Sequence, residues 1–569
     1  DSTTIDKQGI TPLLAEFKKI DAIQSRNDVL QEIAYLQTIN ISALFSLAPY
    51  QDEKNSEKVA VHLFQGGIGL PDRDFYFDKD SHYETIRTEY LIHMQKMFVL
   101  LGDDSVKAKE EAAVVMRMET GLANASRKLE DLRDPQANYN KMTVSKMNKL
   151  TPSIDWKTML ANIGAPKTDT VIVGQPEFFK YTESMMKRTS IADWKIYLRW
   201  NLIRTFAPYL SSDFEKQDFY FNSTILNGTT KQRPRWKRVL ETQETYLGDA
   251  LGQLYVEKYY SEKTRERYVK LVDNIFDAYR ERIQNVNWMT DSTKQKAIAK
   301  LNAVVKKVGY TTKWKDYSSM DIGRESYVQN CINGNIWLTR FYLSKLYKPV
   351  DRTEWEMTPQ TWNAYYNPSN NEIVLPAAIF IIPGFPDSIA DDAIVYGYAG
   401  ASTIGHEITH GFDDEGSQFD DKGNLRDWWS TKDKEEFKKR CRQIIDQFNQ
   451  YVVLDSIQVN GEATQGENIA DLGGIVIALE AFKKTDQYKE GKPIGGLTPL
   501  QRFFMGYALS WYGQYREEAL ATRVKTDVHS PNFLRVNGPF SNVDDFYNAF
   551  GIKKGDAMYR PDSLRVRIW

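Results

Sequence analysis

The sequence has few cysteines, few histidines and no long apolar run, and each shortage excludes a class of protein. The two cysteines among 569 residues, Cys331 and Cys441, are too few for a disulfide scaffold, and without a CxxC pair they form no zinc ribbon. The most apolar stretches, 375–385 and 473–482, are interrupted by Pro, Gly or Glu and are shorter than the roughly 18 residues that span a bilayer. They are typical of buried core.

The chain has no surplus of one charge. Its 74 basic and 76 acidic residues are mixed along the sequence and leave a net charge of −2. No basic segment marks a surface for nucleic acid or anionic lipid, so neither is expected as a partner. A chain of this length, 41% hydrophobic, can bury a large core as two domains or one elaborate one.

Apolar residues at three- and four-residue spacing predict long helices, most clearly at 90–101 and 263–283. Strand patterns are short and scattered, and they lie at 58–64, 170–174, 372–376 and 458–461. The sequence therefore predicts a mainly helical protein with small β-sheets, an α+β fold. A boundary is expected near 325, between a mostly helical part (1–325) and a second part (326–569) that also receives some earlier segments.

The stretch STIGHEITHGFDD, residues 402–414, contains His-Glu-x-x-His in a chain with only six histidines, a chance match on the order of one in a few hundred. If 394–412 is a helix, His406 and His410 lie on one face about one turn apart, as two ligands of one metal ion do. Glu407 then lies beside the metal and suits a general base. The alternative is two histidines that line an apolar helix.

A second helical stretch, GENIADLGG at 466–474, supplies a third candidate ligand, Glu467. One carboxylate and two imidazoles leave a tetrahedral position for water, which is the catalytic type of zinc site. Asp413 and Asp471 are placed to accept the second N–H of the histidines. Taken alone, Glu467 is typical of a solvated helix glutamate.

Together, GHEITHGFDDEG, GENIADLGG and VHSPNFLRVNG (528–538) resemble the neprilysin and endothelin-converting-enzyme family of zinc endopeptidases, which includes bacterial oligopeptidases. The long interval from His410 to Glu467 fits that family and not thermolysin. Nearly the whole chain is covered, because further family-like stretches lie at 66–77, 127–143, 309–317, 362–378 and the closing RIW.

The resemblance implies one Zn²⁺ per chain, held by His406, His410 and Glu467. It makes Glu407 the base that activates zinc-bound water, and it makes Asp413 and Asp471 the residues that orient the ligands, with Asp471 counted among the catalytic residues. It also implies an oxyanion donor, a residue that holds a substrate carbonyl and a pair that binds the peptide backbone. These are His529, Arg535, and Asn363 with Ala364.

The same resemblance places an apolar pocket for the residue after the scissile bond, with Ile379 and Trp511 in its wall. Four positions where bulkier apolar residues are often found carry small or polar ones here, and these are Gly384, Ser402, Thr403 and Ser510. A wider and more polar pocket is expected.

The implied architecture is a thermolysin-like zincin catalytic domain and a helical cap domain that enclose a chamber too small for folded proteins. The implied function is hydrolysis of oligopeptides on the amino side of hydrophobic residues. One alternative is a peptide-binding protein with reduced catalysis, although such a descendant is free to lose Glu407. A strict exopeptidase is the other, but no charged group that captures a substrate terminus is identified.

Members of the family often have a disulfide that joins two regions, at positions that align with Val328 and Gln443. Cys331 and Cys441 are displaced from these positions in compensating directions, so the resemblance implies a Cys331–Cys441 disulfide and an exported protein, periplasmic, cell-surface or secreted. Two buried free thiols are the alternative. The family also has a segment before the region that resembles 5–14, which we expect to accompany this chain as a separate one; the alternative is a sequence that starts late.

Overall fold

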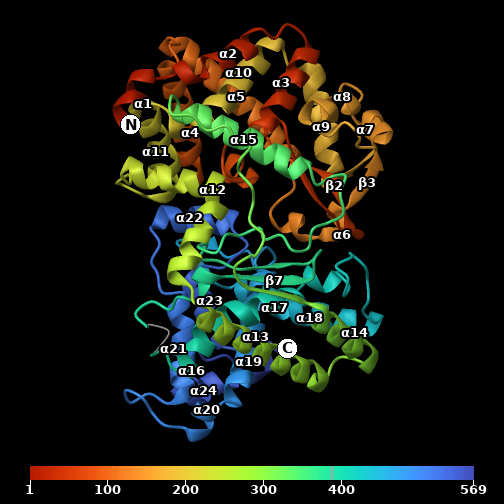
Figure 1. Ribbon diagram of the computed structural model, residues 1–569, viewed down its shortest axis with the longest axis vertical. Coiled ribbons are helices and arrows are strands. Elements are labelled where there is room, and N and C mark those ends of the chain that lie inside the picture. Colours follow the sequence, from red (N-terminus) through yellow and green to blue (C-terminus); the bar gives the residue numbers. More distant parts are fainter. Residues whose placement is uncertain (386–388) are drawn as a thin grey trace.

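The computed structural model describes residues 1–385 and 389–569, which fold into two lobes stacked along the long axis (Figure 1). Each lobe has its own hydrophobic core. The first core contains residues from 13 to 246 and again from 320 to 343, and the second contains residues from 268 to 308 and from 364 to 569. The chain therefore passes between the lobes several times. The predicted mainly helical, two-lobed α+β fold is confirmed.

The first lobe is a helical assembly around one four-stranded sheet in the order β1-β2-β4-β3, in which only β2 and β4 are parallel. Its strands are β1 (Phe45–Asp52), β2 (Asn55–Gln65), β3 (Asn140–Thr143) and β4 (Thr170–Val173). Its main helices are α2 (Leu14–Asp21), α3 (Arg26–Thr38), α4 (Ser81–Leu100), α5 (Ser105–Ala125), α8 (Trp156–Ile163), α9 (Pro176–Arg188), α10 (Ile191–Phe206), α11 (Ser212–Phe219) and α15 (Tyr327–Leu343).

The second lobe holds a three-stranded sheet in the order β5-β7-β6 and a small hairpin of β8 and β9. The strands are β5 (Val305–Gly309), β6 (Tyr365–Asn367), β7 (Glu372–Pro376), β8 (Val452–Leu454) and β9 (Ile457–Gln458). Its main helices are α13 (Glu262–Asn285), α14 (Asp291–Ala303), α16 (Asp392–Val395), α17 (His406–His410), α18 (Thr431–Phe448), α19 (Gln465–Lys483), α21 (Pro499–Ser510), α22 (Glu517–Thr526), α23 (Asn532–Phe540) and α24 (Asp544–Phe550).

Helix α13 illustrates how the sequence determines these elements. The side chain of Ser261 accepts the backbone N–H of Thr264 and caps the first turn. Apolar residues recur every three or four positions and form one buried face, which comprises Tyr268, Leu271, Val272, Ile275, Phe276, Tyr279 and Ile283. The predicted helix at 263–283 lies within this element, and the predicted strands at 58–64 and 372–376 lie within β2 and β7.

The predicted helix at 90–101 and the predicted strand at 170–174 each extend one residue beyond the ends of α4 and β4, but two other predicted elements differ more from the structure. The strand expected at 458–461 is the two-residue β9, which ends at Gln458. The helix expected over 394–412 runs from 392 to 410 but is π-helical at Tyr396–Gly405. A π-helical turn has one more residue than an α-helical turn and is frequent at functional sites. The segment leads directly into α17, which carries the two histidines.

The predicted Cys331–Cys441 disulfide is wrong. Both cysteines are free and buried, Cys331 on α15 in the core of the first lobe and Cys441 on α18 in the core of the second. Burial raises the pKa of Cys331 to about 12, so this thiol stays protonated. The exported location rested on the disulfide and remains a prediction. Among the helices of the described residues, none is both long and apolar enough to cross a membrane.

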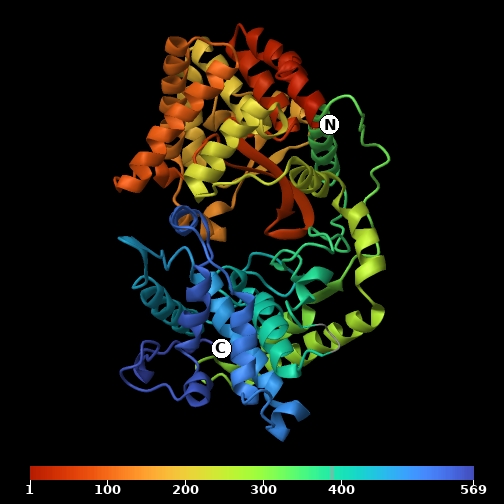
Figure 2. The same cartoon turned by 90° about the vertical axis from the view of Figure 1, so that its left-hand side faces the viewer.

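The lobes are connected along one side by α12 (Arg235–Tyr259), which bends at Leu247 (Figure 2). A cavity of about 1700 Å³ lies between them. Its lining comes from both lobes and includes Tyr50, His62 and Arg133 from the first and Tyr366 and Glu415 from the second. The cavity is large enough for a peptide and is bordered by the loop that follows α17.

Candidate metal centre

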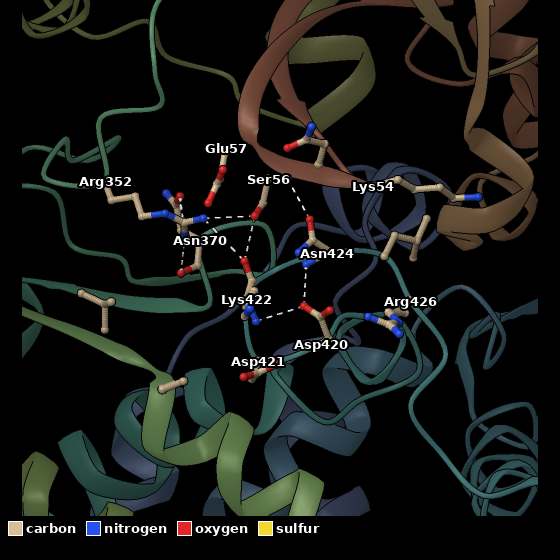
Figure 3. A pocket seen from close by; sticks show the side chains of 14 residues that line it. Lys54, Ser56, Glu57, Arg352, Asn370, Asp420, Asp421, Lys422, Asn424 and Arg426 are labelled. Carbon is tan, nitrogen blue, oxygen red and sulfur yellow. Dashed lines mark hydrogen bonds between the residues drawn. The ribbon is translucent and has the colours of Figure 1, made fainter.

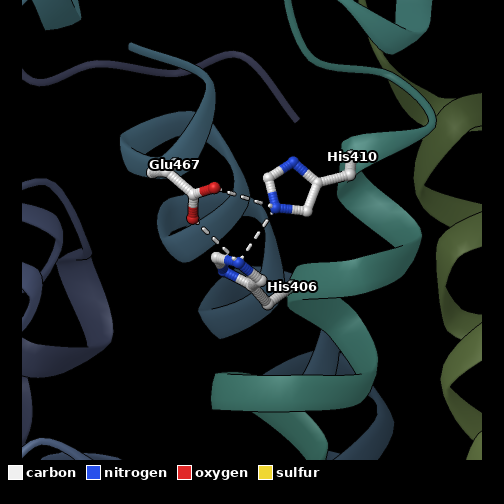
Figure 4. Close-up of side chains that lie close together, drawn as sticks. All are labelled: His406, His410 and Glu467. Carbon is white, nitrogen blue, oxygen red and sulfur yellow. Dashed lines mark hydrogen bonds and ion pairs between the residues drawn. The ribbon is translucent and has the colours of Figure 1, made fainter. Parts of the chain in front are cut away.

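The side chains of His406 and His410 on α17 converge with that of Glu467 on α19 (Figure 4). The Nε2 atoms of the two histidines are 3.0 Å apart, and Glu467 oxygens lie 3.2 Å from His406 Nε2 and 3.6 Å from His410 Nε2. Ligands about 2.0–2.1 Å from a tetrahedral zinc ion are about 3.3 Å from one another. The three separations bracket that value, so these donors fit zinc without rearrangement.

Two glycines let the ligand helices approach closely. A methyl group at Gly405, just before His406, would lie 2.9 Å from both the Cα and the carbonyl oxygen of Gly474 on α19. A methyl at Gly474 would likewise clash with the backbone of Ala401. The two backbones are therefore in contact at this crossing, and any larger residue would push Glu467 away from the histidines.

Each histidine is held by a carboxylate at its other ring nitrogen. His406 Nδ1 lies 2.9 Å from Asp471 Oδ1, and His410 Nδ1 lies 2.7 Å from Asp413 Oδ2. This arrangement leaves Nε2 of each ring facing Glu467. Burial alone would lower the pKa of His406, but Asp471 and Glu467 outweigh it and raise the pKa. A pocket that stabilises positive charge on imidazole also stabilises a bound cation.

Glu407 lies on α17 between the two histidines and is buried, with 7% of its surface exposed. Burial raises the pKa of its carboxyl, and the positive charge of His406 and His410 opposes the increase. A carboxylate with a raised pKa is a better proton acceptor near neutral pH. The position and the environment both suit a general base.

His529 enters the site from the loop between α22 and α23. Its Nε2 lies 3.2 Å from Glu467 Oε2, and its Nδ1 lies 2.6 Å from Asp527 Oδ1. Asp527 therefore fixes the ring with Nε2 directed at the metal ligands. The sequence pattern identified His529 but not Asp527, whose position two residues earlier is the only signal for its role.

Arg535 on α23 lies behind the ligands and is almost fully buried. Two of its nitrogens each donate a 2.8 Å hydrogen bond to Asp471, and its guanidinium lies 3.7 Å above the ring centre of Trp511. A third contact reaches Glu467 at 3.5 Å. The residue expected to hold a substrate carbonyl is thus also tied to the carboxylate that orients His406.

The expected peptide-binding pair lies at the edge of the three-stranded sheet. Asn363 is exposed, its Oδ1 accepts the N–H of Ala364 at 2.9 Å, and both residues directly precede the edge strand β6. Strand β6 contacts α17. An extended peptide paired with this edge would pass beside the metal ligands.

The expected pocket residues are distributed unevenly. Ser402 on the π-helical segment and Ser510 at the end of α21 are 2.8 Å apart through their hydroxyl groups, and Thr403 is buried beside them. Ile379 is buried in the core of the second lobe. Gly384 lies in an exposed turn, where a methyl group would meet no atom within 4 Å.

Sequence reasoning assigned no role to Lys300 on α14, a buried lysine beneath the metal-binding helix. Its Nζ donates to the carbonyl oxygens of Gly411 at 2.7 Å, Gly416 at 2.6 Å and Phe419 at 2.8 Å. It thereby satisfies the backbone where α17 ends and the next loop begins. A lysine in an amphipathic helix is normally a surface residue, so no sequence pattern predicts this role.

The comparisons with known proteins agree along the whole chain. Two models described as peptidase family M13 match residues 1–311 and 363–566. An endothelin-converting enzyme homolog of Locusta migratoria is 32% identical over 540 residues, which cover 91% of this chain and 74% of that protein.

Two solved structures of Mycobacterium tuberculosis zinc metalloprotease Zmp1 are 38% identical to this chain and cover all of it. The complex with an inhibitor matches with a TM-score of 0.96 over 87% of that chain, and the open state matches with a TM-score of 0.71 over 89%. The lobes of this structure are therefore arranged as in the inhibitor complex.

Proposed function

The chain belongs to peptidase family M13 and is a metalloendopeptidase, and from this premise we propose that it hydrolyses oligopeptides on the amino side of hydrophobic residues with one zinc ion held by His406, His410 and Glu467. The observation that carries the proposal is the convergence of these three donors at tetrahedral separations, with Glu407 on the same helix. The donor set is that of a catalytic zinc site, because it leaves a position for water.

When bound there, zinc supplies Lewis acidity, which lowers the pKa of water and polarises the scissile carbonyl. Glu407 accepts the proton of the attacking water and passes it to the leaving amine. His529, directed at the site by Asp527, donates to the carbonyl oxygen as it gains negative charge. Asp413 and Asp471 keep the imidazoles oriented throughout.

The peptide would lie in the cavity between the lobes, paired with the edge of β6 and held by Asn363 and Ala364. Burial of the substrate between two lobes supports cleavage of short peptides and exclusion of folded proteins. The preference for a hydrophobic residue after the scissile bond rests on the family resemblance, which assigns Ile379 and Trp511 to the pocket wall. Trp511 lies against the guanidinium of Arg535, close to the metal ligands. Ser402 and Ser510 add polar atoms and leave room for larger side chains.

A synthetic peptide library, digested and analysed by mass spectrometry, tests the proposal. Cleavage is expected before Phe, Leu and larger aromatic residues, to stop with a chelator and to return with zinc. The Glu407→Gln variant serves as the matched control. It should keep about one zinc per chain but lose about 10²- to 10⁴-fold in turnover, because an amide cannot accept the proton.

Two results would contradict the proposal. Cleavage that persists in excess chelator would exclude the metal mechanism. Binding of peptides and zinc without any cleavage would favour the alternative, a peptide-binding protein of the same fold. An accompanying N-terminal chain and the cellular compartment remain predictions, which intact-mass measurement and cell fractionation test.

A further inference from the structure

Arg133 is a contact between the first lobe and the loop that follows the metal-binding helix. It ends the short 3-10 turn Glu130–Arg133, just before α6 (Pro135–Asn138), at the edge of the upper lobe that faces the lower one (Figure 1). Its Nη2 lies 3.0 Å from both carboxylate oxygens of Asp414 and 2.9 Å from Glu415 Oε1. Both acids belong to the second lobe.

Asp414 and Glu415 directly follow Asp413, the acid that orients the metal ligand His410. Asp413 holds His410 Nδ1 through Oδ2, while its Oδ1 accepts the backbone N–H groups of Glu415 at 2.9 Å and Gly416 at 2.7 Å. The turn at 413–416 is therefore what fixes Asp413, and Asp413 fixes the imidazole. By gripping the side chains of Asp414 and Glu415, Arg133 holds this turn from the opposite lobe.

The same guanidinium also packs against the helix that carries the third ligand. Gly466 directly precedes Glu467, and a methyl group there would clash with Arg133 Nη2 and lie 2.8 Å from Asp414 Oδ1 and 3.1 Å from Asp413 Oδ2. Arg133 thus occupies the space that a side chain at position 466 would need. It lies where the two ligand-bearing elements meet.

Charge explains why this contact matters. Asp413, Asp414 and Glu415 are three consecutive acidic residues, and burial raises the pKa of Asp414 to about 6 and that of Glu415 to about 8, with Arg133 opposing the shift. Without the guanidinium, both pKa values would rise further and the two side chains would lose the partner that orders them. Separation of the lobes removes the guanidinium, because Arg133 moves with the first lobe.

We propose that Arg133 is a positioning residue that couples closure of the lobes to the order of the metal centre. Lys300 holds the backbone of the turn at 413–416 from within the second lobe, and Arg133 orders the side chains of Asp414 and Glu415 only when the lobes are together. This inference rests on the proposed zinc peptidase function. Zmp1 has been solved both with an inhibitor and in an open state, and this structure matches the first with a TM-score of 0.96 and the second with 0.71. That relative therefore adopts two arrangements, and this chain has the one of the inhibitor complex.

The test compares Arg133→Ala with a variant that weakens a different contact between the lobes. In the pocket of Figure 3, the backbone N–H of Ser56 in the first lobe donates to Asn424 Oδ1 in the second at 2.9 Å. This contact reaches none of the metal ligands or the acids that orient them, so Asn424→Ala is the matched control. Zinc affinity is measured by competition with a chromophoric chelator, and kcat and KM are measured separately on one peptide.

Arg133→Ala is expected to weaken zinc binding and to lower kcat, each by about 10- to 100-fold, which is the usual effect of removing a residue that orients metal ligands. The change in KM should be smaller. Arg133→Lys should recover part of both losses, because an ammonium keeps the charge but not the planar fork. Gly466→Ala, whose methyl group would displace the guanidinium and also press on Asp414 and Asp413, should change both quantities in the same direction and serves only as a supporting variant. Asn424→Ala should leave zinc affinity within about twofold of the parent protein.

Unchanged zinc affinity and kcat in Arg133→Ala would overturn the inference. Equal losses in Arg133→Ala and Asn424→Ala would also overturn it, because they would reflect closure alone. If Arg133→Ala does not fold, as judged by circular dichroism, Arg133→Lys decides by the same criteria. A parent protein that binds zinc and cleaves peptide while these variants behave normally would refute only the role of Arg133. A parent protein that does neither would refute the proposed function.

Discussion

Arg535 holds Asp471 through two parallel hydrogen bonds of 2.8 Å, and Asp471 in turn lies 2.9 Å from His406 Nδ1. The three residues form a buried chain from a cation to a metal ligand. Asp471 has the lower pKa expected of a carboxylate beside a guanidinium, because Arg535 outweighs the effect of burial. Arg535 therefore keeps the acid ionised and available to orient the imidazole.

Asp471→Asn is expected to weaken zinc binding by about 10- to 100-fold, because the amide orients His406 less firmly. It should also lower the free energy of unfolding by about 3–5 kcal/mol, since the buried guanidinium loses its counter-charge. Urea unfolding with a chelator present separates this loss from that of bound metal. Unchanged zinc affinity would show that Asp471 does not orient His406.

His529→Ala is expected to lower kcat by about 10²- to 10³-fold with little change in KM, because a donor to developing negative charge acts in the transition state. Asp527→Ala should give a smaller loss of the same kind, since the ring remains but loses its 2.6 Å partner. Steady-state kinetics on one peptide measures both. A loss confined to KM in both variants would assign His529 to substrate binding instead.

The sequence predicted the parts of the site that lie in short motifs. His406, Glu407 and His410 share one helix, Glu467 and Asp471 share another, and the spacing within a helix determines which side chains share a face. The structure adds the convergence of the two helices at Gly405 and Gly474, which no local pattern shows. Contacts that join distant segments depend on packing and not on periodicity.

Arg133 and Lys300 show most clearly which site residues the sequence alone does not predict. Neither basic residue belongs to a recognisable motif, and both contact the backbone or side chains of 411–419 only through the tertiary fold. The disulfide prediction is wrong for a related reason: the compensating displacements of Cys331 and Cys441 require that α15 and α18 pack side by side, but the two helices belong to different cores. The sequence did not show which lobe α15 rejoins.

The width of the substrate pocket is tested with Ser510→Leu. The hydroxyl groups of Ser402 and Ser510 occupy little volume, so a leucine at 510 should narrow the space and shift the preference between Leu and Trp after the scissile bond by about tenfold or more. Met505→Ala, on the exposed face of the same helix α21, is the control. The ratio of kcat/KM for two peptides that differ at this position is the measurement. An unchanged ratio in Ser510→Leu would remove Ser510 from the pocket.

The last prediction concerns Glu32 on α3, a glutamate of the first lobe that is 7% exposed and whose Oε1 has no hydrogen-bond partner. Burial raises its pKa to about 7, and the charge of Lys19 opposes the shift. Because the folded-state pKa exceeds the unfolded value of about 4.3, the native protein binds more protons between the two, and stability falls as pH rises through this interval.

Glu32→Gln removes the ionisable group and keeps its shape. The variant should match the parent protein near pH 4.5, become progressively more stable than it up to about pH 7, and keep a constant advantage above that pH. Urea midpoints at several pH values measure the difference, and Glu110→Gln, at an exposed position of α5, should show no such dependence. A difference that is independent of pH would mean that the pKa of Glu32 is the same in the folded and unfolded protein, and one of opposite sign would mean that the ionised carboxylate is stabilised by folding.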